Sequence, residues 1–223
     1  MKPDSPDTTA GQAVYTPKML SIYDLWVLGV SNSLIWKCRT KHILNWLNQS
    51  LTANHLDVGV GTGYYLEHCT FPAPEVRLGL LDLNPNSLAA AANRSARYQP
   101  EVYQADVLAP LPDQPRPFDS ISLNYLLHCL PGDLSTKGSL FDHLAPWLNS
   151  GAIVSGSTIL SEGVPRGFSA RRLMRFYNQK KIFTNTTDSL DELQSQLASR
   201  YTDVEVQVVG CVALFRARNH SPG

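Results

Sequence analysis

Three glycines alternate along residues 55–64, HLDVGVGTGY, and an aspartate stands two positions before the first of them. Gly59, Gly61 and Gly63 follow a short apolar run, and a turn built this way lets the backbone approach a ligand because no Cβ is in the way. A helix that starts near Gly63 directs its free N–H groups at the same spot. The segment therefore predicts a strand, a ligand-binding turn and a helix.

A carboxylate ends the next apolar run, LGLLDLN, at Asp82. A carboxylate at the end of a second strand suits the hydroxyl groups of a ribose. The glycines are spaced G-x-G-x-G, whereas a dinucleotide site has G-x-G-x-x-G. Tyr64 and Leu66 occupy the region where the third glycine of such a site would stand. The spacing therefore weighs against a nicotinamide-dependent oxidoreductase, which is the less favoured alternative.

DVGVGTG followed by LLDLN resembles the first two motifs of the class I S-adenosylmethionine-dependent methyltransferases. In that family the acidic residue before the glycines, here Asp57, lies near the methionine end of the cofactor, and the glycine loop passes under it. The acidic residue after the second strand, here Asp82, holds the ribose, and its neighbour Leu83 packs against the adenine. The resemblance covers roughly residues 56–218. It implies S-adenosyl-L-methionine as cofactor and S-adenosyl-L-homocysteine as product.

The resemblance extends to the end of the third expected strand, at Asp106 in VYQADV. In the family an acidic residue here receives the adenine amino group, and its neighbour, here Val107, packs on the ring. Strand ends on the ligand side of such a sheet are where binding sites form. The alternative for Asp106 is an aspartate that caps a helix.

The fourth expected strand ends at Asn124 and Tyr125, which in the resembled family lie beside the methionine moiety and the methyl group. Asn124 would accept a bond from the cofactor's ammonium group or offer its backbone carbonyl. His128 lies just beyond, and an imidazole takes up a proton near neutral pH without special tuning. His128 is therefore the candidate general base for a hydroxyl or amine acceptor. Its alternative role is to pack or cap the turn between strand and helix.

Aromatic residues gather before the first motif, among them Tyr15, Tyr23, Trp26 and Trp36. In related enzymes an N-terminal helical segment folds over the cofactor, and an aromatic face attracts a cationic sulfonium. Tyr15 and Tyr23 are the candidates for that contact. Trp26 and Trp36 are better explained as core residues of a helical cap.

Strand and helix patterns alternate from residue 55 onward, which indicates an α/β fold with helices on both faces of a parallel sheet. Strands are expected over 55–58, 76–81, up to 106, from 118 and over 152–160. A helix is expected over 135–148, closed by Gly151 as a C′ residue. Two β-rich runs about Gly210 predict a terminal antiparallel hairpin. Together with the resemblance, this predicts a Rossmann-like, doubly wound, mostly parallel seven-stranded sheet with an N-terminal helical lid.

The 223 residues are expected to form one domain with its cap. Residues 1–12 are polar and are expected to be a disordered tail. Residues 13–53 are expected to form the N-terminal helical cap, and residues 54–218 the methyltransferase domain.

The amino-acid composition restricts the kinds of partner and ligand that are expected for this protein. The chain has 19 basic and 19 acidic residues, and this neutral balance argues against a nucleic acid partner. No apolar stretch is long enough to span a bilayer. The cysteines are scattered, with no C-x-x-C pair, and no cluster has the spacing of metal ligands, so neither structural zinc nor a catalytic metal is expected. A cytoplasmic monomer or homodimer fits these features.

The resemblance implies a methyltransferase that acts on O or N of a small-molecule acceptor, with secondary metabolism as its setting. A basic segment, SARRLMRFYNQKK, follows the fifth strand and is expected to be helical. It either binds an anionic group of the acceptor or forms a solvated helix face. A second alternative concerns the whole protein, since a non-methylating member of the fold would carry the same cofactor motifs.

Overall fold

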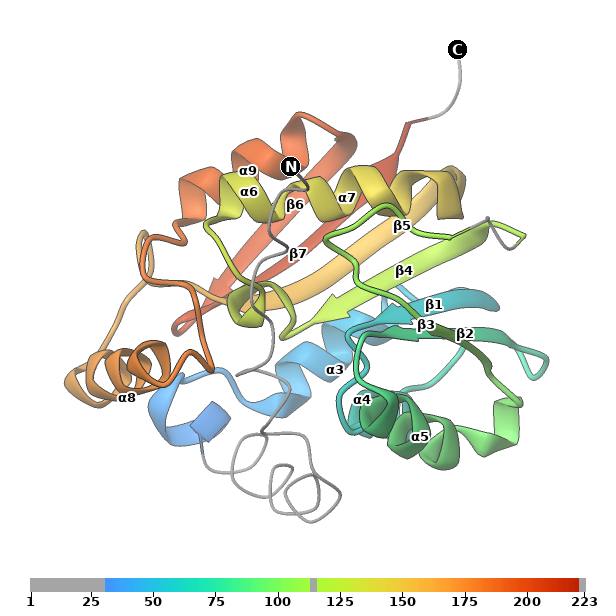
Figure 1. Ribbon diagram of the computed structural model, residues 1–223, viewed down its shortest axis with the longest axis horizontal. Helices are drawn as coiled ribbons and strands as arrows, with labels where there is room; N and C mark the ends of the chain where they lie inside the picture. Colours follow the sequence, from blue (N-terminus) through green and yellow to red (C-terminus); the bar gives the residue numbers. More distant parts are fainter. Residues whose placement is uncertain (1–30, 113–115, 221–223) are drawn as a thin grey trace, which may run out of the picture.

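The computed structural model describes residues 31–112 and 116–220 (Figure 1). Tyr15, Tyr23, Trp26 and the polar tail at 1–12 lie outside the described residues. Within these ranges, no helix combines the length and the apolar character needed to cross a membrane.

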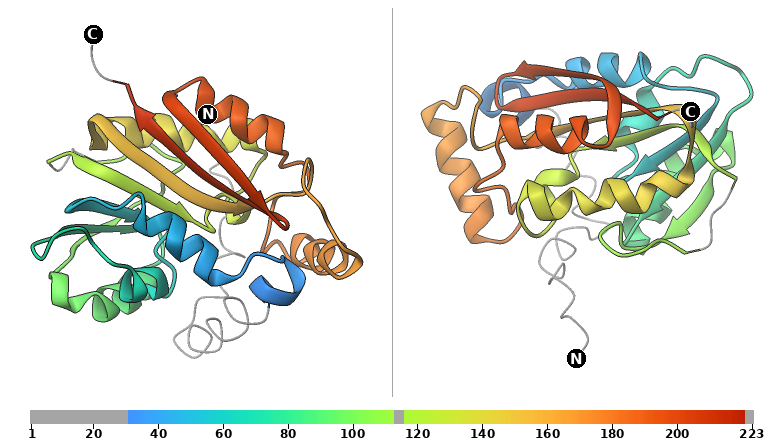
Figure 2. Two further views of the ribbon diagram at one scale, coloured as in Figure 1. Left: turned by 180° about the vertical axis from the view of Figure 1, so that it is seen from behind. Right: turned by 90° about the horizontal axis from the view of Figure 1, so that it is seen from above.

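One seven-stranded sheet forms the centre of the fold, with strand order β3-β2-β1-β4-β5-β7-β6. β7 runs antiparallel to β5 and to β6, and the other pairs are parallel. The hairpin of β6 and β7 makes one edge of the sheet (Figure 2). This confirms the predicted doubly wound sheet with its terminal hairpin. The strands are β1 (Asn54–Val58), β2 (Arg77–Asp82), β3 (Glu101–Gln104), β4 (Phe118–Asn124), β5 (Leu148–Ile159), β6 (Tyr201–Val209) and β7 (Val212–Asn219).

Helices cover both faces of the sheet (Figure 1). One face carries α3 (Thr40–Asn48), α4 (Tyr64–His68) and α5 (Pro85–Arg94). The other carries α6 (Leu134–Lys137), α7 (Ser139–Leu144) and α9 (Leu190–Ala198). The basic segment after β5 forms α8 (Phe168–Gln179), as its sequence predicts. The described elements also include a π-helical turn at 31–35 and three 3-10 turns, η2 (Ala96–Tyr98), η3 (Leu127–Cys129) and η4 (Ala145–Trp147).

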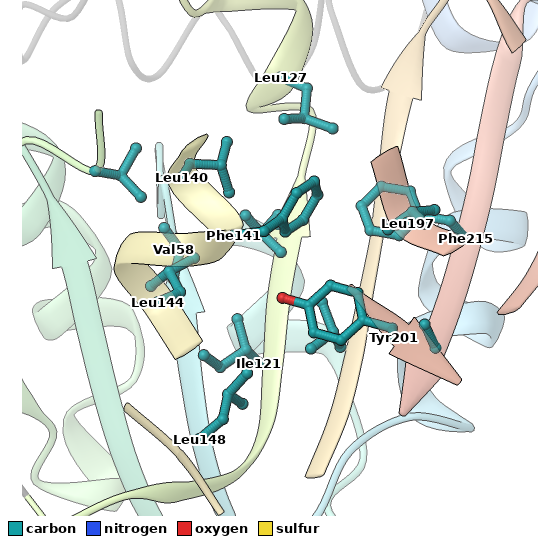
Figure 3. Packing of buried hydrophobic residues seen from close by; sticks show 14 of the residues in the cluster. Val58, Ile121, Leu127, Leu140, Phe141, Leu144, Leu148, Leu197, Tyr201 and Phe215 are labelled. Carbon is teal, nitrogen blue, oxygen red and sulfur yellow. The ribbon is translucent and has the colours of Figure 1, made fainter. Parts of the chain in front are cut away.

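The larger core lies between the sheet and the layer of α6, α7 and α9 (Figure 3). Phe141 of α7 packs edge-on against Tyr201 and Phe215, with ring centroids 5.7 and 6.5 Å apart. Val58 of β1 and Ile121 of β4 contribute to this core from the sheet. These strands are apolar on this face, and such burial is the main favourable term in folding. The core thereby fixes the two strands whose ends frame the site.

The opposite layer begins with α3, which packs on the back of the hairpin. Trp46 Nε1 donates a hydrogen bond to the carbonyl of Phe215 at 2.9 Å. The turn of the hairpin also holds the chain before α3, since Cys211 N donates to Trp36 O at 2.8 Å. Gly210 permits this approach, because a Cβ there would stand 2.1 Å from Trp36 O. Trp36 is 1% exposed and is a core residue, as predicted.

The helix predicted over 135–148 is interrupted. α6 ends at Lys137, α7 ends at Leu144, and the chain then passes through a 3-10 turn into β5. Pro146 has no N–H to continue the helical hydrogen bonds, which is why the helix stops there. Gly151 is therefore not a C′ residue. It lies within β5 at φ +71°.

Local side-chain bonds set two other boundaries. β3 ends at Gln104 and not at Asp106, because Asp106 Oδ1 accepts the N–H of Leu108 at 2.9 Å and turns the chain. α9 begins after Ser189, whose Oγ accepts the N–H of Glu192 at 3.1 Å.

Candidate active site

The site lies where the strand order reverses, between β1 and β4. Their successors β2 and β5 lie on opposite sides of this pair. In an open α/β sheet, the carboxyl ends of the strands at such a switch point leave a crevice for a ligand. The loops after β1, β2 and β4 therefore converge on one edge, as the sequence predicted.

The glycine loop after β1 has all three glycines at positive φ, +72° at Gly59, +53° at Gly61 and +77° at Gly63. A Cβ at Gly63 would stand 2.6 Å from the Cα of Ala91 in α5, and one at Gly59 would stand 2.7 Å from Leu126. These two glycines let α5 and the loop after β4 pack closely. Among residues 31–112 and 116–220, a Cβ at Gly61 would meet nothing within 4 Å. Toward these residues Gly61 thus presents uncovered backbone, as a cradle for a ligand requires.

Asp82 ends β2 beside this loop. Its Oδ1 accepts the N–H of Asn84 at 2.8 Å. Burial raises the pKa of Asp82, and the backbone amides of Asn84, Gly61, Leu83 and Val60 oppose that rise. The carboxylate therefore lies against the glycine loop, and it accepts hydrogen bonds from the backbone there.

Asp57 lies inside β1 and is 6% exposed. Burial raises its pKa to about 7, and the charge of Asp82 adds to the rise. A hydrogen bond donated by Ser122 Oγ opposes it. Asp57 is therefore a carboxyl group that titrates near neutral pH, which is typical of groups in functional sites.

Asn124 ends β4 with an unsatisfied donor. Its Oδ1 accepts the hydroxyl of Ser157 at 3.1 Å. Its Nδ2 is buried and finds no hydrogen-bond partner among residues 31–112 and 116–220. A buried polar atom without a partner is costly, so its presence at a strand end calls for a ligand.

The next residue, Tyr125, adopts φ +58°, which is uncommon for a bulky side chain. Its hydroxyl donates to Asn32 Oδ1 at 2.8 Å, and its N–H donates to Ser157 O at 2.8 Å. Strained backbone of this kind clusters at functional sites. The Asn32 contact also ties the chain before α3 to the end of β4.

His128 lies in η3 and is 2% exposed. Its Nδ1 accepts the N–H of Ile159 at 3.3 Å, with Thr158 Oγ1 at 3.4 Å. Its ring packs edge-on against Phe183 and Tyr125, with centroids 4.5 and 5.3 Å apart. Burial, with a smaller effect from the charge of Lys137, lowers the pKa of His128 to about 3. The imidazole is therefore neutral. The sequence suggested a ring that takes up a proton near neutral pH, and burial prevents this.

The residues expected at an adenine pocket follow β2 and β3. Leu83 is half-buried, and Asp106 is half-buried with one carboxylate oxygen in the turn to Leu108. Val107 is 5% exposed and packs in the larger core. The Asp106 side chain thus organises its own turn through Oδ1.

A buried polar cluster next to His128 was not predicted from the sequence. Lys137 Nζ of α6 contacts Asp188 Oδ2 at 2.7 Å and donates to Thr184 O at 2.9 Å. Thr184 N in turn donates to His128 O at 2.9 Å. Asn185 Nδ2 donates to Ile159 O at 2.8 Å. The cluster fastens the segment after α8 to η3 and to the end of β5.

The arginines of α8, Arg171, Arg172 and Arg175, are exposed, whereas Ala170 and Met174 are buried against the domain. This favours a solvated helix face over an anion-binding wall. Within the described ranges, no group of three or more His, Cys, Asp or Glu residues is placed to hold a metal ion.

A family model described as "Methyltransferase domain" matches residues 56–154. The chain is 42% identical to demethylluteothin O-methyltransferase of Streptomyces thioluteus, over 93% of this chain and 90% of the relative. It is 41% identical to the physcion biosynthesis cluster O-methyltransferase of Aspergillus chevalieri, over 94% and 95% of the two chains. A solved structure of similar fold is the N-methyltransferase NodS of Bradyrhizobium japonicum WM9 with S-adenosyl-L-homocysteine. Its TM-score is 0.63 at 18% identity, over 94% of this chain and 98% of that one.

Proposed function

Because this chain belongs to the class I S-adenosylmethionine-dependent methyltransferases, we propose that it methylates a hydroxyl oxygen of a small-molecule acceptor in secondary metabolism. The observation that carries the choice of oxygen is the similarity at about 40% identity, over nearly the whole chain, to two relatives named as O-methyltransferases. The name of one relative gives its acceptor as demethylluteothin, and the name of the other assigns it to physcion biosynthesis.

The residues at the switch point fit S-adenosylmethionine. Among the described residues, no atom lies within 4 Å of a Cβ placed at Gly61, and the buried Nδ2 of Asn124 lacks a partner. Two carboxyl groups, Asp57 and Asp82, flank the glycine loop. The cofactor carries an ammonium group, a carboxylate and ribose hydroxyls, so each polar group of the site has a complementary partner.

We assign the roles by this complementarity. Asp57 accepts the ammonium group, Asn124 and Tyr125 border the methionine part, and Asp82 accepts the ribose hydroxyls. Leu83, Asp106 and Val107 border the adenine. When bound, S-adenosylmethionine supplies a methyl group on an electrophilic sulfonium. The chain's own work is to hold the acceptor oxygen in line, exclude water and take up a proton where the acceptor requires it.

Replacing Asp82 with alanine is expected to weaken binding of S-adenosylhomocysteine at least about tenfold, because hydrogen bonds to a charged group contribute roughly 1.5–3 kcal/mol each. Isothermal titration calorimetry measures the change. Asp119→Ala is the control, since that aspartate follows Phe118 near the opposite end of β4. Unchanged affinity in a folded Asp82→Ala protein would remove Asp82 from the ribose site.

We propose that residues 13–53 act as a cap over the cofactor, with Tyr15 and Tyr23 facing the sulfonium. The support within the described residues is the bond from Tyr125 to Asn32, which ties this segment to the site. Deleting residues 1–30 keeps Trp36 and its core contacts. The shortened protein is expected to fold but to lose most of its turnover. Full turnover, measured by S-adenosylhomocysteine release, would contradict the cap.

We further propose that the protein acts in the cytoplasm, as a monomer or homodimer, on a small molecule and without nucleic acid. The neutral charge balance supports this, as do the four cysteines, which are all free. Light scattering with and without added duplex DNA tests the assembly. Larger oligomers or a stable DNA complex would contradict it.

The function is tested with the purified protein, S-adenosylmethionine and paired acceptors. Demethylluteothin and a set of phenols are compared with amines of the same carbon skeleton. The expected result is one S-adenosylhomocysteine per methyl ether formed. Methylation of the amines alone would contradict the oxygen assignment. Tight cofactor binding without S-adenosylhomocysteine formation, even with extract of the source cells, would favour the non-methylating alternative.

A further inference from the structure

A ladder of polar side chains runs inside the sheet from the start of β1 to Asp57. Thr52 Oγ1 lies 2.8 Å from Ser120 Oγ, and Ser120 Oγ lies 2.8 Å from His55 Nδ1. His55 Nε2 lies 3.0 Å from Ser122 Oγ, which hydrogen-bonds to Asp57 Oδ1. Each member thus contacts the next, and the last member is the carboxyl group assigned to the cofactor's ammonium.

Strand pairing builds this ladder. β1 and β4 are parallel neighbours, with His55 opposite Ser120 and Asp57 opposite Ser122. Residues two apart in a strand point to the same face, so the four side chains form one row. His55, Ser120 and Ser122 are all fully buried. Most of the row is therefore shut off from water, and its hydrogen bonds must be satisfied by the row itself and by nearby backbone groups, such as the N–H of Thr52 that donates to Ser120 Oγ at 3.1 Å.

The protonation state of Asp57 determines which way the hydrogen bonds along the row point. An ionised Asp57 only accepts, so Ser122 Oγ–H must point to it. Ser122 then accepts from His55 Nε2–H, and Nδ1 accepts from Ser120 Oγ–H. A protonated Asp57 can donate to Ser122 instead. Ser122 then donates to Nε2, the ring proton moves to Nδ1, and Ser120 donates to Thr52. The number of protons on the other members is the same in both states.

We propose that the ladder from Thr52 to Asp57 is a proton relay that sets the charge of Asp57 for the cofactor's ammonium group, with the tautomer of neutral His55 following that charge. This rests on the proposed function, because the ammonium belongs to S-adenosylmethionine. Ser122 and His55 are positioning residues here, since they act on the cofactor through Asp57.

The pKa values of the groups in and around the ladder are compatible with a proton relay. Burial lowers the pKa of His55 to about 3, so the ring stays neutral and transmits protons without becoming a cation. Burial raises the pKa of Asp57 to about 7. Of the other groups that face Asp57, the Asp82 carboxylate raises that pKa and the Ser122 hydroxyl lowers it. The Cys69 thiol has a pKa of about 12 and is neutral. An arriving ammonium favours the carboxylate, so binding expels a proton from Asp57.

The sign of the pH dependence follows. Below pH 7 Asp57 is protonated and offers no charge to the ammonium, so affinity for S-adenosylhomocysteine rises with pH through about 7. The probe 5′-methylthioadenosine has the same nucleoside but no amino-acid part. Its affinity is expected to be nearly constant over this range.

The experiment measures both ligands by calorimetry from pH 5.5 to 8.5, a range chosen to bracket the titration of Asp57 at about 7. Ser122→Ala removes the hydrogen bond that lowers the pKa of Asp57. We expect about tenfold weaker S-adenosylhomocysteine binding at neutral pH, an inflection moved to higher pH, and unchanged 5′-methylthioadenosine binding. Ser155→Ala is the matched control, since Ser155 is a buried serine opposite Ser122 on β5 whose hydroxyl donates to Ile121 O.

Nitrogen-15 NMR of the unmutated protein gives an independent measurement. His55 is expected to carry its proton on Nε2 with S-adenosylhomocysteine bound and on Nδ1 in the free protein at low pH. A single tautomer under all conditions, or a Ser122→Ala protein that behaves like Ser155→Ala, would overturn the relay. Binding that does not depend on pH would overturn the relay alone. Failure to bind S-adenosylhomocysteine at any pH would overturn the proposed function.

Discussion

Replacing Lys137 with methionine is expected to lower the free energy of unfolding by about 3–5 kcal/mol, because the substitution leaves the Asp188 carboxylate buried without its partner. Both side chains are fully buried, and their charged atoms are 2.7 Å apart. The lysine contacts Asp188 Oδ2, and Asp188 Oδ1 has no hydrogen-bond partner within the described ranges. Burial lowers the pKa of Lys137 and raises that of Asp188, and their mutual attraction opposes both changes. Urea unfolding followed by circular dichroism measures the loss.

Two further variants serve as controls for the Lys137→Met result. Lys180→Met removes an exposed lysine beyond α8 and is expected to change stability by less than about 0.5 kcal/mol. Lys137→Met combined with Asp188→Leu removes both charges and is expected to regain much of the stability. A single Lys137→Met protein as stable as Lys180→Met would show that the pair contributes nothing to the fold.

The same cluster has a consequence for the site. Thr184 links the Lys137 ammonium to the carbonyl of His128, and Phe183 packs on the His128 ring at 4.5 Å. Loss of the pair therefore loosens the wall that holds His128, even where the protein still folds. Turnover of Lys137→Met is expected to fall more than its affinity for S-adenosylhomocysteine.

Replacing His128 with asparagine is expected to lower turnover roughly a hundredfold while leaving cofactor affinity nearly intact, if His128 takes the proton of the acceptor hydroxyl. In the structure Nδ1 accepts the N–H of Ile159, which leaves the ring proton on Nε2. To accept a proton at Nε2, the ring must first give up that bond and carry its own proton on Nδ1, with Thr158 Oγ1 at 3.4 Å as the acceptor. Because the pKa of His128 is about 3, its protonation gives no inflection in turnover between pH 5 and 8. Stopped-flow or steady-state rates over that range provide the measurement.

Asparagine separates the two roles of this residue. Its side-chain oxygen takes the place of Nδ1 and accepts the N–H of Ile159, so the structural bond at 3.3 Å is kept while Nε2 is removed. A His128→Asn protein with parental turnover would make His128 a packing residue. A variant that loses affinity for S-adenosylhomocysteine would instead make it part of the cofactor wall.

The sequence by itself determined the features that depend on residues close together in the chain. Alternation of apolar runs with turn residues predicted the parallel sheet, and the glycines predicted the loop because only glycine takes positive φ there without strain. Asp82 could be identified from the sequence because it ends an apolar run, so that only the strand itself had to be recognised.

Only the tertiary structure decided which distant side chains meet. Ser122 reaches Asp57 and His55 across 65 and 67 positions of the chain, because β4 inserts beside β1 in the sheet. Lys137 reaches Asp188 across 51 positions. No local pattern encodes such pairs. Their burial in turn sets their chemistry, since desolvation makes Asp57 titrate near neutral pH and keeps His128 uncharged. The sequence thus identifies the ionisable groups of the site, and their burial in the folded protein determines whether each of them is charged.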